Sequence, residues 1–409
     1  MKGVIFTGGD YPLGSSAQRI RMWHYGLFAN EIEADIIIAD YAPSEQDKRN
    51  SENFVHFMLN TKREKKTENK IKLSLINVYQ RVLGLYKSHR FLKQNYQKVN
   101  FVFQYGVGFL EGLMIHRFCK KNGILYLVER TDENRRLFSE KKSILGEIAI
   151  LNDLFFDKYI LKKADALFVI SKYLEEKYKK THPSLYLIRS APSFTNIERF
   201  IEQQKRDIHN LDKPGINVFF NGKIKIVFAG SCVYTNGLKF FLECAAKLIK
   251  KEYEFDIVFI FFKGLINEIV DFAEQLKITK NITIIENVYT DYIPAIYKYS
   301  DILVLPEMGI TVANAGFPGK TAEYLASGRA IISTDFSDLS DYLINGYNAL
   351  ISPIGDYDLY TNNLENLISN PELRTHLGKN AIITAKERFD YIQNVKPLIA
   401  VVKEKSLSI

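Results

Sequence analysis

Cysteine is scarce in this 409-residue chain, which contains only Cys119, Cys232 and Cys244. They form no C-x-x-C pair, so the sequence excludes a disulfide scaffold and a cysteine zinc site and favours a reducing compartment. The seven histidines show neither H-x-x-x-H nor H-E-x-x-H spacing. We therefore predict no metal site and no metal cofactor.

Long hydrophobic runs are also missing. The longest apolar stretches, such as 257–262, have the length of strands, whereas a membrane-spanning helix needs about 20 apolar residues. The apolar run after Met1 is too short for a signal peptide. We expect a soluble cytoplasmic chain, peripheral at most on the inner face of the plasma membrane. Its 46% hydrophobic residues suffice for about two domain cores.

Positive charge is concentrated in one N-terminal stretch. Between Lys48 and Lys98 there are 13 Lys and Arg residues but only three acids, whereas the whole chain has a net charge of +8. Apolar residues recur at helical spacing from Ile71 to Leu85, among lysines, arginines and aromatics. Such a basic amphipathic helix suits an anionic membrane surface. A solvated helix packed on its domain is the competing interpretation, and the absence of a nucleic-acid-binding signature argues against a nucleic-acid partner.

Short β-rich runs alternate with amphipathic stretches, which predicts parallel sheets covered by helices. The predicted strands are 3–7, 35–39, 101–105, 124–129, 166–170, 185–188, 224–229, 257–262, 282–285, 302–306, 330–334 and 349–351. The predicted helices are 16–29, 69–95, 110–122, 145–163, 172–180, 238–251, 266–277, 292–300, 320–327, 339–344, 357–369 and 371–389.

The β/α rhythm breaks once, in a segment rich in proline, glycine and charge. We therefore expect an N-terminal Rossmann-like domain over 1–195, a linker over 196–222 and a second Rossmann-like domain over 223–389. The tail 390–409 would form one more helix, returning towards the first domain. Two doubly wound α/β domains of this kind are expected to face each other across a cleft.

The segment 315–334 carries the clearest chemical signal. A glycine-rich loop leads into a helix, Gly328 ends that helix, and a buried strand follows. Loop amides and a helix N-terminus bind phosphate, and Lys320 adds a positive charge in the first turn. Glu323 lies one turn further on, where it would accept hydrogen bonds from vicinal hydroxyls such as those of ribose. An ordinary loop–helix packing unit is the competing interpretation.

Several segments in order along the chain resemble one family. They are Gly8 to Arg19, Asp165 to Ser171, Phe228 to Ser231, Asp301 to Pro306, Ala315 to Thr334 and Gly346 to Leu350. Together they resemble the nucleotide-sugar-dependent glycosyltransferases of the GT-B fold, specifically the retaining family 4. The resemblance implies two Rossmann-like domains, a nucleotide diphosphate-sugar as co-substrate and no metal.

The resemblance also implies a donor site. Its glycine loop would bring Gly14 against the donor, the loop after strand 282–285 would place Val288 at the base, and Glu323 would hold the ribose. The donor-binding residues expected on this basis are Gly14, Gly230, Ser231, Asn236, Lys263, Val288, Gly316, Phe317, Pro318, Gly319, Lys320, Thr321 and Glu323.

This chain departs from the family pattern at three positions. Ala315 replaces the first glutamate of the E-x(7)-E motif, and Ser231 and Asn236 occupy the positions of a basic pair that contacts the leaving diphosphate. The charge of a departing diphosphate must be neutralised. Lys320 is the first candidate for that role and Lys263 the second.

The acceptor side is less specified. The strand that starts at Ile124 ends in Glu129, Arg130 and Asp132. The two acids would orient an acceptor hydroxyl and Arg130 would contact phosphate, or else the three form a structural ion-pair cluster. The D-x-D sequence at Asp356 and Asp358 directly precedes a predicted helix, which favours a helix cap over a metal motif.

The leading hypothesis is a retaining hexosyltransferase. It would act on a lipid-linked or polysaccharide acceptor in bacterial cell-surface glycan synthesis, such as lipopolysaccharide or capsule. The alternative is a catalytically impaired GT-B protein that binds a nucleotide sugar or a partner. An NAD-dependent oxidoreductase is disfavoured because Gly8, Gly9 and Gly14 do not form G-x-G-x-x-G.

Overall fold

The chain forms two compact units, 1–192 with 394–409, and 193–393. The computed structural model describes residues 3–7, 36–40, 54–58, 85–94, 97, 99–105, 108–131, 144–189, 196–232, 236–308 and 317–406. None of the described helices combines the length and the hydrophobicity that a membrane crossing requires.

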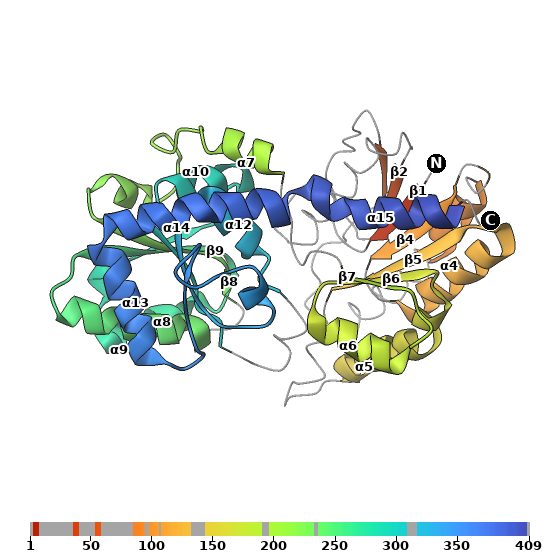
Figure 1. Cartoon of the computed structure of the whole chain (residues 1–409), viewed down its shortest axis with the longest axis horizontal. Helices are drawn as coiled ribbons and strands as arrows, with labels where there is room; N and C mark the ends of the chain where they lie inside the picture. The colour runs from red at the N-terminus through yellow and green to blue at the C-terminus, as the bar shows by residue number, and fades with distance from the viewer. Residues whose placement is uncertain are drawn as a thin grey trace, which may run out of the picture. The chain divides into compact units, whose positions relative to one another are not determined.

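The first unit is built on a seven-stranded parallel sheet in the order β3-β2-β1-β4-β5-β6-β7 (Figure 1). Its strands are β1 (Gly3–Thr7), β2 (Ile36–Asp40), β3 (Phe54–Met58), β4 (Phe101–Tyr105), β5 (Leu125–Arg130), β6 (Ala166–Val169) and β7 (Leu187–Arg189). Strand β3 was not predicted, because its short FVHFM run lies within the polar, basic stretch that we interpreted by its charge.

Helices of the first unit are α4 (Phe109–Asn122), α5 (Ile144–Tyr159), η3 (Leu161–Lys163) and α6 (Lys172–Thr181). Within the predicted basic helix 69–95, residues 85–94 are helical, and the rest of that stretch lies outside the described residues. The last helix, α15 (Tyr391–Ser406), starts in the second unit. From Asn394 onwards it belongs to the first unit, where Val395, Leu398 and Val402 are buried.

The second unit contains a six-stranded parallel sheet in the order β10-β9-β8-β11-β12-β13. Its strands are β8 (Ile224–Cys232), β9 (Phe255–Gly264), β10 (Ile282–Glu286), β11 (Ile302–Leu305), β12 (Ala330–Thr334) and β13 (Leu350–Ser352). The helical elements are α7 (Ile197–Gln203), η4 (Ile216–Phe220), α8 (Asn236–Lys250), α9 (Ile266–Leu276), η5 (Thr279–Asn281), η6 (Thr290–Tyr292), α10 (Ile293–Lys298), α12 (Lys320–Ser327), η7 (Leu339–Asp341), α13 (Tyr357–Ser369), α14 (Pro371–Thr384) and η8 (Ala385–Phe389).

Both faces of the second sheet are covered, as parallel sheets require. Alternate residues of each strand point to opposite cores: Val227 and Leu303 lie in one cluster, whereas Ile226 and Ile302 lie in the other. Helices α7, α10, α12 and α14 cover the first face, and α8, α9 and α13 cover the second (Figure 1).

The segment that we expected to be a linker, 196–222, belongs to this core. Phe200 of α7, Ile208, Ile216 and Phe219 of η4 are buried in the same cluster as the central strands. The glycines that suggested a linker flank a short helical turn: Gly215, with a positive φ of 85°, directly precedes η4, and Gly222, with a positive φ of 78°, follows it. The expected helix 339–344 is shorter and is the single turn η7.

Candidate functional site

The strand order of the second unit has a switch point between β8 and β11. From β8 the chain builds outward through β9 and β10, and it then returns to build β11, β12 and β13 on the other side. In open α/β sheets ligands bind at the carboxyl ends of the strands at such a point. The carboxyl ends of β8, β9, β10 and β11 are therefore the place to look for a site.

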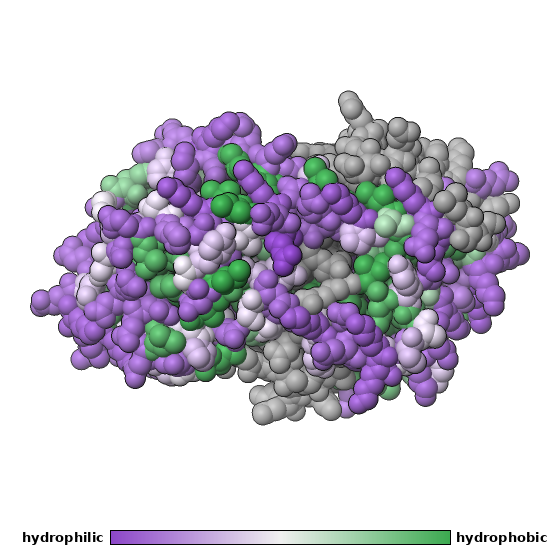
Figure 2. Space-filling model, viewed as in Figure 1, coloured by the Kyte–Doolittle hydropathy of each residue, from purple (hydrophilic) through white to green (hydrophobic). Residues whose placement is uncertain are grey.

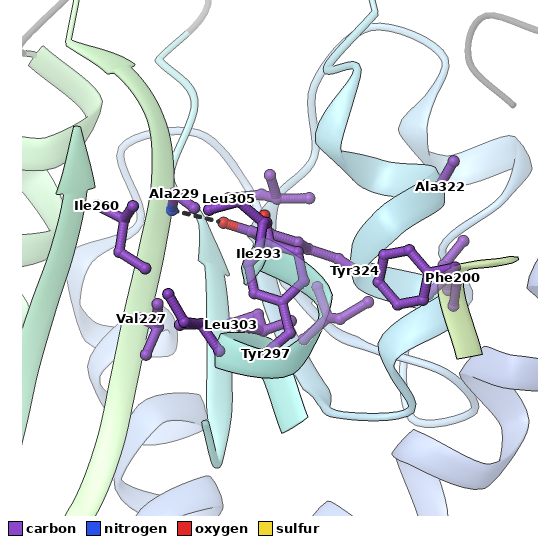
Figure 3. Close-up of a cluster of buried hydrophobic side chains, with 14 of the residues drawn as sticks. Phe200, Val227, Ala229, Ile260, Ile293, Tyr297, Leu303, Leu305, Ala322 and Tyr324 are labelled. Atoms are coloured by element: carbon purple, nitrogen blue, oxygen red, sulfur yellow. Dashed lines mark hydrogen bonds between the residues drawn. The ribbon is translucent and has the colours of Figure 1, made fainter. Parts of the chain in front are cut away.

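Strands β8 and β11 separate as they approach this edge. Their pairing stops at Val227 and Leu303, and beyond it the Tyr324 hydroxyl of α12 accepts a hydrogen bond from the backbone N–H of Ala229 at 3.0 Å (Figure 3). A buried backbone N–H without a partner is costly. Tyr324 thus replaces the missing strand contact and fixes α12 against the end of β8.

Helix α8 also approaches this edge closely. A Cβ at Gly237, in the first turn of α8, would lie 1.7 Å from the carbonyl oxygen of Pro306, which follows β11. Only glycine lets these backbones come so near. The start of α8 and Tyr324 of α12 therefore lie by the ends of the two strands that flank the switch point.

Lys320 and Glu323 form the charged centre of the site. They lie one turn apart on α12, and the Lys320 Nζ is 3.1 Å from Oε2 of Glu323. The same ammonium lies 5.6 Å from the ring centroid of Phe262, at the end of β9, in a cation–π contact. The side chains of Lys320 and Glu323 are 23% and 14% exposed, respectively. Both charged groups are therefore accessible to a ligand and at the same time held in place.

Tyr297 of α10 holds the Glu323 carboxylate through a hydrogen bond. Its hydroxyl donates to Oε2 of Glu323 at 3.3 Å. Its ring packs edge-on against Tyr324 (Figure 3). Burial, with the neighbouring Glu323 charge, raises the pKa of Tyr297 well above its usual value. The phenol therefore stays protonated and acts as a donor to the carboxylate. Sequence reasoning missed both tyrosines, because nothing in the chain pattern distinguishes them from other core aromatics.

The loop before α12 is held by its own contacts. Thr321 was expected among the donor-binding residues, but it is fully buried, and both its N–H and its hydroxyl donate to the carbonyl of Pro318. Phe317 packs against Tyr342 and Phe389, so its side chain serves the core. The residue before the helix, Gly319, supplies no side-chain cap. Backbone groups are what this loop offers to a ligand.

The other expected donor residues of this unit lie on the same sheet edge. Gly230 and Ser231 are in the irregular last part of β8, Asn236 is the first residue of α8, and Lys263 is near the end of β9. The side chains of Ser231, Asn236 and Lys263 lie outside what the structure describes. Val288 is 3% exposed and points into the core, which leaves only its backbone for a base.

Three expected site residues, Gly14, Asp132 and Gly316, lie outside the described residues. Of the acceptor candidates, Glu129 is buried at the end of β5 in the first unit. Arg130 requires a correction. Its guanidinium is 4% exposed and lies 3.6 Å from Asp153 and 3.4 Å from Asp157 of α5.

Arg130 is thus part of a buried cluster and not a phosphate ligand at the surface. Its Nε donates to the Tyr178 hydroxyl at 3.0 Å, and that hydroxyl donates to Asp157. The expected alternative joined Arg130 to Glu129 and Asp132. The structure pairs Arg130 instead with two acids of α5, more than 20 residues away in sequence, and with the hydroxyl of Tyr178 in α6. Burial raises the pKa of Asp153 even though the Arg130 charge opposes the shift.

Two further motifs have structural roles. Asp356 caps α13 by accepting a hydrogen bond from the N–H of Leu359, as the cap interpretation of the D-x-D sequence predicted. In the Gly346 turn, the buried Asn348 side chain accepts from the N–H of Ile344 and donates to Tyr342 and Thr384. It ties that turn to α14.

Comparison with known proteins agrees with this geometry. Residues 211–384 match the family model described as glycosyl transferases group 1. A protein named as an uncharacterized glycosyltransferase, from Methanocaldococcus jannaschii, is 26% identical over 292 residues, covering 68% of this chain and 67% of that protein.

Solved structures show the same fold at low identity. Sucrose-phosphate synthase from Thermosynechococcus elongatus aligns over 100% of both chains with a TM-score of 0.74 at 13% identity. The HepE protein of Anabaena, solved in complex with UDP-glucose, aligns over 100% of both chains with a TM-score of 0.65 at 10% identity.

The fold of two parallel Rossmann-like sheets is thus the GT-B fold. The family match lies within the second unit, so residues 211–384 are similar in sequence to group 1 glycosyl transferases.

Proposed function

We propose that the chain is a retaining hexosyltransferase that uses a UDP-sugar donor bound at the carboxyl edge of the second sheet. The observation that carries this proposal is the Lys320–Glu323 pair on the first turns of α12, beside the switch point of the sheet. The structure of Anabaena HepE in complex with UDP-glucose supports uracil as the base.

The two charges suit the two ends of the diphosphate–ribose unit. Lys320 lies at the helix N-terminus, where the amide dipoles also favour negative charge, so it would neutralise the departing diphosphate. Glu323, held by Tyr297, would accept hydrogen bonds from the ribose hydroxyls. Without a donor the two side chains neutralise each other, and a bound donor would exchange that ion pair for contacts to its own phosphate and hydroxyls.

For the acceptor we propose a lipid-linked or polysaccharide glycan of the cell surface. The support is the excess of positive charge between Lys48 and Lys98, which suits an anionic membrane surface. The described part of this stretch includes the helical residues 85–94.

A second candidate is a GT-B protein that binds a nucleotide sugar without turnover. Ala315, Ser231 and Asn236 favour it, because the family carries charged side chains at these positions. Both candidates share the donor site and differ in the fate of the donor.

The test is a panel of UDP- and GDP-sugars, with nucleoside diphosphate release and thermal stability measured in parallel. We expect UDP-sugars to stabilise the protein, since a ligand at 100 times its Kd adds about 2.7 kcal/mol, and one of them to be turned over. Stabilisation with no release of UDP, with or without acceptor glycans, would favour the binding protein. If no sugar nucleotide stabilised the protein and none released a nucleoside diphosphate, both candidates would be overturned.

A further inference from the structure

Helix α5 shows an inverted distribution of polarity. Its inner face carries Asp153 and Asp157, which pair with Arg130, beside the fully buried Phe156. Its outer face carries leucines and aromatics. Surface helices normally do the reverse, with apolar residues inward and charges outward.

The outward residues form one patch. Leu151, Leu154, Phe155 and Tyr159 recur at intervals of three and four, so they share one side of the helix. They are between 37% and 52% exposed, and Leu110, in the first turn of α4, is 56% exposed. Phe109 contacts the rings of Phe155 and Tyr159, which joins the start of α4 to α5. We refer to Leu110, Leu151, Leu154, Phe155 and Tyr159 as the α5 patch.

Such a patch is unusual for a surface of this kind. On the face of the molecule that Figure 2 shows, the described residues are mainly hydrophilic, and apolar residues occur in small separate groups. Contiguous apolar surface marks an interaction site.

Lysines border the α5 patch at one end. Lys158 lies on the same side of α5, with its Nζ 5.3 Å from the ring centroid of Tyr159. Lys162 and Lys163 follow in η3 and are exposed. The nearby acid Asp157 faces inward to Arg130, whereas Asp165, two residues after Lys163, is exposed. Three exposed lysines against this one exposed acid leave the charge at this end positive. Glu147 is exposed at the opposite end of the helix.

We propose that the α5 patch and its three lysines dock the protein on an anionic membrane surface. Leucine and phenylalanine side chains enter the headgroup boundary, tyrosine suits the interface, and lysines contact anionic headgroups. The buried Arg130 cluster holds the acids inward and keeps this face turned out. The inference deepens the proposed function by naming a membrane contact distinct from the 48–98 stretch. It rests on the proposed function in one respect, namely that the acceptor is carried by a membrane.

The test is vesicle flotation of the full-length protein. We expect binding to vesicles of phosphatidylcholine with 30% phosphatidylglycerol, weaker binding to phosphatidylcholine alone, and release at high salt. Two variants probe the surface: Leu154→Gln with Phe155→Gln, and Lys158→Glu with Lys162→Glu and Lys163→Glu. Each should weaken binding at least about tenfold, the scale expected from several interfacial contacts.

Matched controls lie on the second unit. Leu359→Gln with Ile383→Gln removes two exposed apolar side chains, and Lys280→Glu with Lys379→Glu and Lys386→Glu makes the same charge change. These variants should float like the wild type. Donor turnover, measured without lipid, should be unchanged in all four, which separates this inference from the donor chemistry.

Three results would overturn the inference. The first is that the wild type fails to float with anionic vesicles. The second is that both patch variants float as well as the wild type, because binding would then belong to another surface. The third is a dimer in sedimentation that the Leu154 and Phe155 substitutions dissociate without any effect on flotation, since a second copy would then cover the patch.

Discussion

At the scale of single residues, the candidate site centres on one ion pair, to whose two members we assign separate roles in donor binding. Lys320 and Glu323 were each predicted to bind the donor, and the structure shows that they also bind each other at 3.1 Å. Their mutual contact keeps a lysine and a carboxylate in place on a half-buried surface. A donor that brings both a diphosphate and a diol satisfies each of them separately.

Replacing Lys320 by alanine tests the role assigned to its charge. We expect turnover to fall by about two orders of magnitude or more, the usual loss when one electrostatic stabiliser is removed. Lys298→Ala, at the exposed end of α10, is the matched control. Initial rates of UDP release measure the effect, and near-wild-type turnover would remove Lys320 from the mechanism.

Replacing Tyr297 by phenylalanine keeps the buried ring and removes the hydroxyl that holds Glu323. We expect the KM for the donor to rise roughly tenfold, since hydrogen bonds to charged groups are worth about 1.5–3 kcal/mol, with a much smaller change in kcat. Steady-state kinetics over a range of donor concentrations separates the two constants.

Tyr324→Phe is the matched control for this prediction. It leaves the N–H of Ala229 without its acceptor, so we expect a stability loss of about 1–3 kcal/mol and little change in donor KM. Equal effects of the two substitutions on KM would show that Tyr297 has no special link to the donor.

At the scale of elements, the bounds of α12 could be predicted from the sequence, whereas the orientation of α5 could not. Helix α12 was predicted with its bounds, 320–327, because glycines delimit it: Gly319 precedes it and Gly328 ends it with a positive φ of 69°. The range of α5 was also close, but its orientation depends on Arg130, which lies on a strand and is separated from it in sequence.

Arg130→Met tests whether this arginine positions α5. Breaking a buried ion cluster on one side leaves uncompensated charge and costs about 3–5 kcal/mol, so chemical denaturation should show a large loss of stability. Arg130→Lys, which keeps the charge without the planar fork, should lose less. Stabilisation by UDP should persist in both. A stable Arg130→Met protein that lacks only transfer activity would restore the phosphate-contact interpretation.

At the scale of the whole molecule, the chain consists of two units of similar construction, and the proposed donor site lies in the second. Among the described residues, those of the proposed donor site come from the second unit: β9 supplies Phe262, α10 supplies Tyr297, and α12 supplies Lys320 and Glu323. The expected linker is part of that unit, because Phe200 and Ile216 complete its core. The described part of the proposed donor site therefore lies in one compact body.

Hydrogen exchange of the full-length protein checks this assignment. Saturating UDP should slow exchange in peptides that cover 262–264, 286–289 and 317–324, where bound nucleotide would order the strand ends and the start of α12. Peptides from α9 and α13, on the far face of the same sheet, serve as internal controls. Protection confined to those control peptides would place the nucleotide elsewhere.

The sequence alone determined what depends on neighbours along the chain. Alternating β and α runs predicted parallel sheets, and short β-rich runs placed strands such as Ala330–Thr334 correctly. It also determined that Lys320 and Glu323 share one helix, because their spacing of three residues is local. The cap at Asp356 was predictable for the same reason.

Only the tertiary structure decided which distant side chains meet. Tyr297 reaches Glu323 across 26 residues, Tyr324 reaches Ala229 across 95, and Arg130 reaches Tyr178 across 48. No local pattern encodes such contacts, since they depend on strand order and on which helix face is buried. The physical reason is that buried polar groups must find partners wherever the fold provides them, and that requirement turned Arg130 inward and left the apolar face of α5 outward.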